Sequence, residues 1–159
     1  VNQMEVSDVT KLEEPLRTHF KMQVPRYAEV LPGTLRFFPF GAGRSFSQVM
    51  AALPERKHDI VFPGVWKNTL QFRYPLPDGF SPEQLPGPTT LDSAFGSVKL
   101  TTAVVDGALT CDVMMTMTSA RISTKDYAAF RTWLLNVDEA FSRKLTVRKV
   151  GAQTAEWVQ

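Results

Sequence analysis

The chain has 159 residues, of which 43% are hydrophobic and 21% are charged, so it can bury a core without disulfides or metal ions. Its 18 basic and 16 acidic residues are interleaved and leave a net charge of +2, without the basic stripe that nucleic-acid binding requires. No apolar run approaches the roughly 20 residues of a membrane span, and the one cysteine cannot form an internal disulfide. We therefore expect neither a nucleic-acid partner nor a membrane-spanning segment.

The limits of the chain suggest one domain within a longer protein. We expect a single domain over residues 1–150 and a flexible tail over residues 151–159, with Trp157 as the one large anchor of that tail. Because the first residue is Val1 rather than Met, we also expect a processed chain or, in preference, a fragment of a longer polypeptide.

The first half of the chain predicts short strands and one helix. From Leu16 to Val24 apolar and polar residues alternate strictly, which predicts a strand with one solvent-facing side that ends at Pro25. Ser45 to Leu53 carries apolar residues at helical spacing behind a serine that can cap a helix, so a short helix is predicted before Pro54. Further strands are predicted over residues 34–38, 57–62 and 69–76, the last with Leu70, Phe72, Tyr74 and Leu76 on one face.

Residues 77–88 predict a loop, because Pro77-Asp78-Gly79 and Pro86-Gly87-Pro88 combine fixed and permissive backbone angles. Regular structure is expected to resume near Leu91.

Asp106-Gly107 predicts a β-hairpin with a two-residue turn, and such a turn fixes which residues face each other. The resulting register gives one nearly all-apolar face, with the pairs Val104–Leu109, Thr102–Cys111, Leu100–Val113 and Val98–Met115. The other face pairs Val105–Ala108, Ala103–Thr110, Thr101–Asp112 and Lys99–Met114, so it can meet solvent. A slip by one residue would exchange the two faces and destroy this agreement.

Residues 123–142 predict a helix. Ser123 is the expected N-cap, with Asp126 at the capping-box position and Ile122 stapled to Tyr127. One apolar stripe is expected to face the core, formed by Tyr127, Phe130, Trp133, Leu134, Val137 and Phe141. Residues 145–147 return to a period of two and predict a last short strand.

Short strands separated by turn signals, without alternating helices, indicate a mainly β fold. We predict an antiparallel β-sandwich with one C-terminal α-helix packed against it.

Several short sequence motifs in this chain are similar to those of a known family. They are Phe72-Arg73-Tyr74, Leu76-Pro77-Asp78-Gly79-Phe80, Leu85-Pro86, Phe95-Gly96-Ser97, Asp106-Gly107 and the segment from Asp126 to Arg131. Through them, roughly residues 10–150 resemble the C-terminal β-sandwich module of bacterial transglutaminase-like proteins. In that family a domain of unknown function and a papain-like transglutaminase core precede the module. The resemblance implies a partner domain in the same polypeptide and a location in the cell envelope or outside the cell.

The resemblance carries over no catalytic residue, because the Cys, His and Asp triad belongs to the preceding core. Cys111 is the one candidate nucleophile, but its position on the apolar hairpin face predicts a buried thiol. His19 and His58 lack partners at metal-ligand spacing and are expected to face solvent. Gly41-Ala42-Gly43-Arg44 predicts a turn rather than a phosphate loop, because Phe46 stands where a third glycine is needed.

Three further groups have competing structural and binding interpretations. Arg143, Lys144, Arg148 and Lys149 suit the end of a helix and solubility, or an acidic partner or membrane surface. Met115 and Met117 fall on the core face, which leaves Met114 outside. Phe62, Trp66 and Tyr74 are expected in the core, the alternative being an exposed platform for sugar or peptide.

The expected function is a non-catalytic accessory module of a larger transglutaminase-like protein. No catalytic, cofactor-binding or metal-binding residue and no cofactor is expected. The first alternative is an independent glycan- or peptide-binding sandwich that reads its ligand through residues 63–68 or 82–88. A free-standing hydrolase or transferase ranks last, because one thiol and two scattered histidines form no assembling motif.

Overall fold

The computed structural model describes residues 3–8, 10, 13, 18–21, 24–41 and 45–151. Its largest sheet contains β6 (Trp66–Pro75), β10 (Ala108–Met117), β9 (Gly96–Val105) and β8 (Thr89–Ser93), in that order and antiparallel throughout. A second antiparallel sheet contains β3 (Glu29–Leu31), β4 (Thr34–Phe37), β12 (Leu145–Lys149) and β7 (Phe80–Pro82). The fold is mainly β, as predicted.

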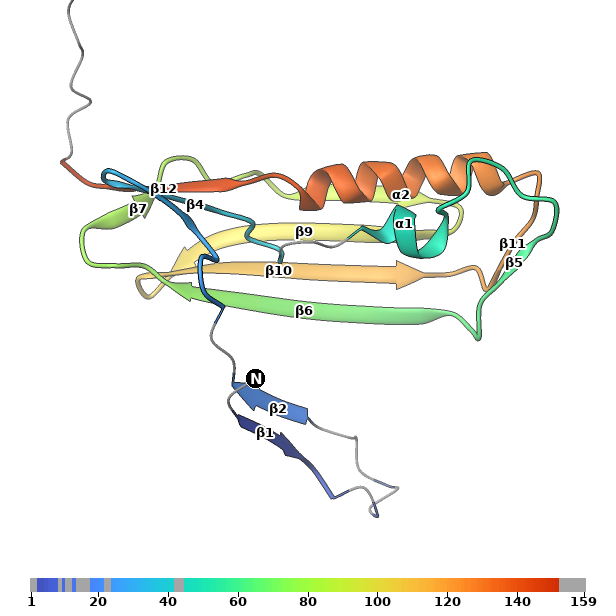
Figure 1. Ribbon diagram of the computed structural model, residues 1–159, viewed down its shortest axis with the longest axis horizontal. Coiled ribbons are helices and arrows are strands. Elements are labelled where there is room, and N and C mark those ends of the chain that lie inside the picture. Colours follow the sequence, from blue (N-terminus) through green and yellow to red (C-terminus); the bar gives the residue numbers. More distant parts are fainter. Residues whose placement is uncertain are drawn as a thin grey trace, which may run out of the picture.

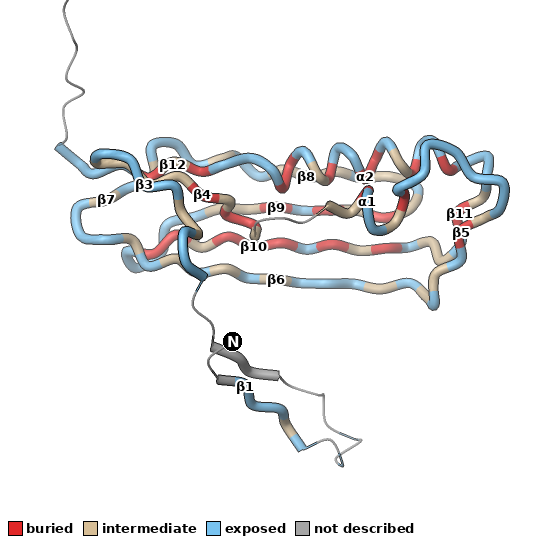
Figure 2. The backbone as a smooth tube through the Cα atoms, viewed as in Figure 1, coloured by how far each residue is buried: buried red, intermediate tan, exposed pale blue. Residues whose placement is uncertain are grey.

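The second sheet shares its layer with the C-terminal helix α2 (Tyr127–Phe141), which runs directly into β12 (Figure 1). This layer lies over one face of the β6-β10-β9-β8 sheet, and the short helix α1 (Phe46–Met50) packs against α2. One core cluster joins both layers, with buried residues from β9, β10, α2, β4 and β12. The buried positions follow β10 and the inner side of α2 in Figure 2.

Two smaller pairs of antiparallel strands complete the described structure. β5 (Ile60–Val61) pairs with β11 (Arg121–Ile122) beside the start of α2, and β1 (Gln3–Val6) pairs with β2 (Thr18–Lys21) near the N-terminus. No helix of the described chain is long and apolar enough to cross a membrane.

The β9–β10 hairpin has the predicted register over all ten residue pairs. Asp106 and Gly107 have φ angles of 49° and 68°, and two positive angles identify the type I′ turn that a two-residue hairpin favours. The predicted core face is buried from Val98 to Leu100 and from Leu109 to Met117. Thr102 is half-buried, and Val104 is 45% exposed because it lies beside the turn at the end of the sheet.

The predicted stripe of α2 is buried at all six positions, so the helical period identified the core face correctly. The α-helix itself begins at Tyr127 rather than at Ser123. The backbone N–H of Asp126 donates to Ser123 O, three residues back, and to Ser123 Oγ, so a tighter turn precedes the helix. Ile122 and Tyr127 lie in the same buried cluster, as a staple requires.

Other predicted boundaries need correction. β7 lies inside the predicted loop of residues 77–88, because its three residues are ordered by pairing with β12 and not by local pattern. Neither β1 nor β3 was predicted, and β5 covers only two residues of the expected strand 57–62. The strand expected from Leu16 to Val24 appears as β2, while residues 14–17, 22 and 23 lie outside the described residues. β6 begins three residues before the predicted strand 69–76 and ends one residue before its predicted end, at Pro75, on the edge of its sheet.

Candidate functional site

Cys111 lies on β10 between Thr102 of β9 and Phe72 of β6, and its side chain is 0% exposed. Burial, with a smaller contribution from the neighbouring Asp112 carboxylate, raises the pKa of the Cys111 thiol to about 12. The thiol is therefore protonated at neutral pH and out of reach of a substrate, which matches the buried role predicted for it.

The two histidines do not contribute to a described metal or catalytic cluster. His58 is exposed beside Asp59, and the backbone of His19 lies in β2 opposite Glu5, with its side chain outside the described part. Among the residues that the structure describes, no three His, Cys, Asp or Glu side chains come together to hold a metal ion.

The glycine-rich segment begins with a turn, in which Gly41 N–H donates to Phe38 O over 3.4 Å. Residues 42–44 lie outside the described residues, so the rest of the predicted turn is not covered.

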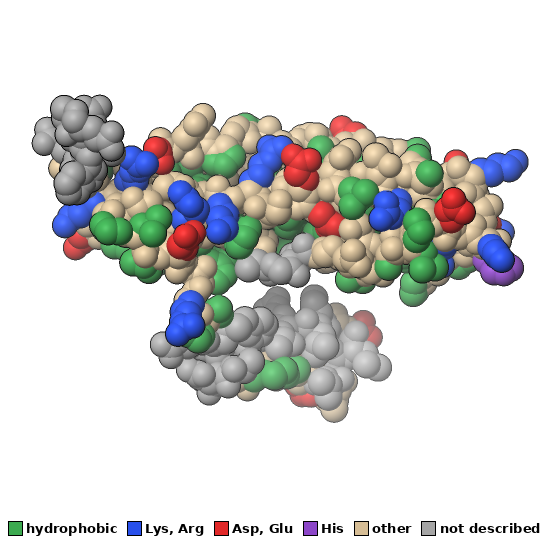
Figure 3. Space-filling model, turned by 45° about the horizontal axis from the view of Figure 1, so that its top comes forward, with side chains coloured by type: hydrophobic (Ala, Val, Ile, Leu, Met, Phe, Trp, Pro, Cys, Tyr) green, Lys and Arg blue, Asp and Glu red, His purple; other side chains and the backbone are tan. Residues whose placement is uncertain are grey.

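The cationic group near the C-terminal end of α2 is largely neutralised by acidic neighbours. Arg143 Nη2 lies 3.5 Å from Glu139 Oε1, Lys144 Nζ lies 3.4 Å from Glu29 Oε2, and Arg148 Nε lies 3.3 Å from Glu83 Oε2. Basic and acidic side chains are interspersed on this face in Figure 3. Arg143, Lys144 and Glu83 also line a hollow of about 580 Å³, whose mixed charges favour no strongly anionic ligand.

The aromatic residues considered as a platform point to different parts of the core. The ring centroid of Phe62 lies 6.1 Å from that of Phe130, and the centroid of Tyr74 lies 4.9 Å from that of Phe37. Trp66 is half-buried against the core cluster. Met115 and Met117 are buried and Met114 is 40% exposed, as the register predicted.

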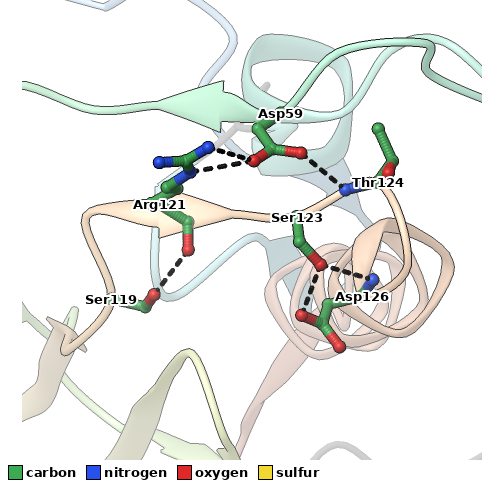
Figure 4. A network of polar contacts seen from close by, with 6 residues as sticks. All are labelled: Asp59, Ser119, Arg121, Ser123, Thr124 and Asp126. Carbon is green, nitrogen blue, oxygen red and sulfur yellow. Dashed lines mark hydrogen bonds and ion pairs between the residues drawn. The ribbon is translucent and has the colours of Figure 1, made fainter.

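A polar network joins β5, β11 and the start of α2 (Figure 4). Asp59 Oδ2 accepts from Nε of Arg121 over 2.8 Å and lies 2.8 Å from its Nη2, while Asp59 Oδ1 accepts from Thr124 N–H over 3.0 Å. These contacts lower the pKa of Asp59, and the Arg121 hydrogen bond has the largest effect. Ser123 Oγ donates to Asp126 Oδ2 over 2.6 Å. Each carboxylate is already hydrogen-bonded within this network, so the network holds β5, β11 and the start of α2 together and leaves neither carboxylate free for a ligand. We call these residues the clasp.

An apolar groove opens between the two sheets at the C-terminal end of β6. Its volume is about 170 Å³, and it is lined by Tyr27, Ala28, Leu35, Phe37, Tyr74, Pro75, Leu76, Pro77 and Val147. Sequence reasoning named Tyr74 but not Tyr27, because the contact between them joins residues 47 positions apart and leaves no local periodic signal.

The hydroxyls of Tyr27 and Tyr74 lie 2.8 Å apart and also contact the carbonyls of Phe38 and Pro39, at 2.9 Å and 3.1 Å respectively. Two hydroxyl protons serve three contacts, so at most two of them are hydrogen-bonded at one time. Burial and the bond to Tyr27 raise the pKa of Tyr74, so the phenol stays neutral. The groove therefore offers ring and aliphatic surface and no ionisable group suited to proton transfer.

Comparison with solved structures finds a similar fold in a crystal structure described as "a putative protease" from Parabacteroides distasonis. The two share 14% sequence identity with a TM-score of 0.58, over 73% of this chain and 23% of that one. This chain thus spans about a quarter of the solved protein, and at this identity the likeness concerns the fold alone. No curated protein matches the chain.

A family model described as a domain of unknown function with a solved structure, DUF3858, matches residues 34–147. This match runs from the start of β4 into β12, so it includes the β6-β10-β9-β8 sheet, α2 and most of the second sheet, with β3 outside it. The chain belongs to the DUF3858 family.

Proposed function

We propose that this chain is a non-catalytic accessory module of a larger transglutaminase-like protein, in which it orients the catalytic domain or recruits substrate to it. The observation that carries the proposal is the unequal coverage in the structural match, 73% of this chain against 23% of the solved protein. The same architecture there forms a minor part of a longer chain, as an accessory module does.

The chemistry of the described side chains supports this role. The one thiol is buried and its pKa is raised, whereas a thiol nucleophile requires a lowered pKa. Asp59 and Asp126 are bonded within the clasp, and in the apolar groove burial raises the pKa of the Tyr74 phenol. Proteases and transglutaminases both attack the acyl carbon of an amide, so the description of the solved protein is compatible with the same class of parent enzyme.

The test compares the full-length parent protein with a variant lacking residues 24–151, using transfer of a fluorescent amine to casein and to a short glutamine peptide. Loss of the module should raise KM for casein and leave kcat for the short peptide within about twofold, because the catalytic groups remain. Measurable transfer by the 159-residue chain alone would contradict the accessory role. Unchanged kinetics on both substrates would contradict it as well.

The resemblance to transglutaminase-like proteins also implies that the parent is bacterial and exported to the cell envelope. Fractionation of cells that express the tagged parent tests this, with recovery in the periplasmic or membrane fraction expected. An array of glycans applied to the 159-residue chain tests the alternative function, and a specific signal there would favour the independent binding module.

A further inference from the structure

Among the described strands, β6 is the longest on a sheet edge, with ten residues from Trp66 to Pro75. Within the described chain β6 pairs only with β10, and it forms the lower edge of the sheet in Figure 1. An edge strand of this length presents a row of backbone N–H and C=O groups that another strand can pair with.

The hairpin register determines which groups of β6 are free. The two-residue turn makes Val105 and Ala108 a hydrogen-bonded pair, so Leu109 and every second residue after it in β10 direct their N–H and C=O towards β6. Leu109 lies opposite Tyr74 and Cys111 opposite Phe72, so the even-numbered residues of β6 bond to β10. The odd-numbered residues Lys67, Thr69, Gln71 and Arg73 therefore direct their backbone groups outwards.

Pro75 agrees with this assignment. It is the next odd-numbered residue, and its missing N–H falls on the open side, where proline is tolerated in a strand. Leu76 N–H, one residue later, donates to Gly107 O over 3.2 Å and so points to the hairpin side.

The side chains of β6 divide into two chemical faces at this edge. Lys67, Thr69, Gln71 and Arg73 are exposed on the solvent-facing side of the sheet, with a cation at each end of the row. On the opposite side, the apolar residues Trp66, Leu70, Phe72 and Tyr74 are only half-buried, and the exposed Asn68 interrupts their row. The apolar groove beside Tyr74 and Pro75 continues this side towards the second sheet.

We infer that the open edge of β6 binds an extended segment of a partner polypeptide in which apolar residues alternate with polar ones and two carboxylates lie six residues apart. Lys67 and Arg73 are themselves six residues apart, roughly 20 Å along a strand, so the carboxylates face them in either strand direction. The alternate apolar residues would cover the half-buried side of β6. This inference rests on the proposed function, since it names the surface through which the module engages its partner domain.

The same charges disfavour a second copy of this chain as the occupant. Antiparallel self-pairing that uses all four outward residues places Lys67 opposite Arg73 of the other copy, twice, and like charges directly opposite are destabilising. A slip by two residues in one direction removes the repulsion but places Lys67 opposite Pro75, which has no N–H to donate. A slip in the other direction places Arg73 opposite Val65, which lies before the start of β6.

The test uses the 159-residue chain and the capped peptide Glu-Val-Thr-Val-Thr-Val-Glu, with amide hydrogen exchange followed residue by residue by NMR. The peptide should slow exchange at Lys67, Thr69, Gln71 and Arg73, while Leu70 and Phe72, already bonded to β10, should change little. The same peptide with Lys in place of both Glu residues should bind about tenfold more weakly or worse.

Three variants separate edge pairing from general attraction. The double variant Lys67→Glu/Arg73→Glu should reverse the preference between the two peptides, whereas Lys99→Glu should not, because Lys99 is exposed on the same face but lies on the interior strand β9. Thr69→Pro should abolish binding of both peptides by removing a central outward N–H. Both charge variants change exposed side chains, so they test the inference even if Thr69→Pro does not fold.

Exchange that is unaffected by the Glu peptide would overturn the inference, as would slow exchange of the same four amides in the free chain or a concentration-dependent dimer in sedimentation. If the edge does not bind but deletion of residues 24–151 still raises KM for casein, the inference fails and the proposed function stands. If the edge binds the Glu peptide and the deletion has no kinetic effect, the binding surface stands and the proposed function fails.

Discussion

The Asp138 carboxylate of α2 accepts a hydrogen bond over 2.6 Å from the backbone N–H of Phe46, the first residue of α1. The same carboxylate accepts from Ser47 N–H over 3.1 Å and from Ser47 Oγ over 2.5 Å. The first N–H groups of a helix have no partner within it, so Asp138 supplies across 92 residues what a local cap supplies elsewhere. The predicted Ser45 cap is also present, through a longer contact of 3.4 Å from Gln48 N–H.

Replacing Asp138 with Ala should lower the free energy of unfolding by about 1–3 kcal/mol, because it leaves two helix N–H groups and the buried Ser47 hydroxyl without an acceptor. Urea unfolding followed by tryptophan fluorescence measures this. Glu139→Ala is the matched control, since Glu139 is exposed and its carboxylate pairs with Arg143 at 3.5 Å on the surface of α2. It should change stability by less than about 0.5 kcal/mol, and equal losses in the two variants would contradict the role of Asp138.

Gly96 of β9 leaves no room for a side chain against the backbone of β10. A Cβ placed on Gly96 would lie 2.0 Å from Thr116 O, so a side chain here forces the β9 and β10 backbones apart. Gly96→Ala should destabilise the chain by about 1–3 kcal/mol or more, read from the midpoint of thermal unfolding. Gly87→Ala is the control, because a Cβ at Gly87 meets nothing within 4 Å. A Gly96→Ala variant as stable as Gly87→Ala would show that the strand separation is not limiting.

Features that depend on local chemistry could be predicted from the sequence. The Asp106-Gly107 turn fixed all ten pairs of the hairpin, because a two-residue loop leaves one register that buries a single apolar face. The buried stripe of α2 followed from its 3.6-residue period.

Features that depend on partners far away in the chain could not be predicted from the sequence. β7 is a three-residue strand between Gly79 and Glu83, and only β12, more than 60 residues later, orders it. The Tyr27–Tyr74 contact and the Asp138 cap likewise join residues far apart in the chain. The open edge of β6 required the sheet order as well as the hairpin register, because the sequence does not show which strand lies outermost.

The buried thiol of Cys111 should react slowly in the folded chain. Iodoacetamide at pH 8 should modify it at the rate of global unfolding, and much faster in urea, because the folded thiol is inaccessible and its pKa is about 12. Mass spectrometry of the alkylated chain measures both rates. Rapid modification in the absence of urea would show a reactive thiol and revive the enzyme hypothesis.

The same thiol makes stability fall at high pH. The pKa of the thiol is about 12 in the folded chain and about 8.5 in the unfolded chain, so the unfolded chain loses its proton first as the pH rises. The free energy of unfolding is therefore unaffected by this group below pH 8.5 and falls above it. Between these values each pH unit should cost about 1.4 kcal/mol, a loss that Cys111→Ala should not show. Comparing the two chains cancels groups that do not interact with Cys111. The pKa of Tyr74 is raised in part by Cys111, but its contribution falls above its unfolded pKa of about 10, so the comparison is made between pH 9 and pH 10. Parallel loss in both chains between pH 9 and pH 10 would contradict the assignment to Cys111.

The Asp59 clasp should fail in acid. Its hydrogen bond from Arg121 lowers the folded pKa below the unfolded value of about 3.9, so its stabilisation is present above that value and is lost as the pH falls through the folded pKa. Thermal unfolding of wild type and Asp59→Asn should therefore differ at pH 6 and converge as the pH is lowered below about 4. Asp92→Asn, which changes an exposed carboxylate on β8, is the control and should follow wild type across this range.

Because the clasp joins β5 to β11 and to the turn before α2, its loss should first increase hydrogen exchange at Ile60, Val61 and Ile122. Exchange that increases first in the β9–β10 hairpin would show that acid acts elsewhere.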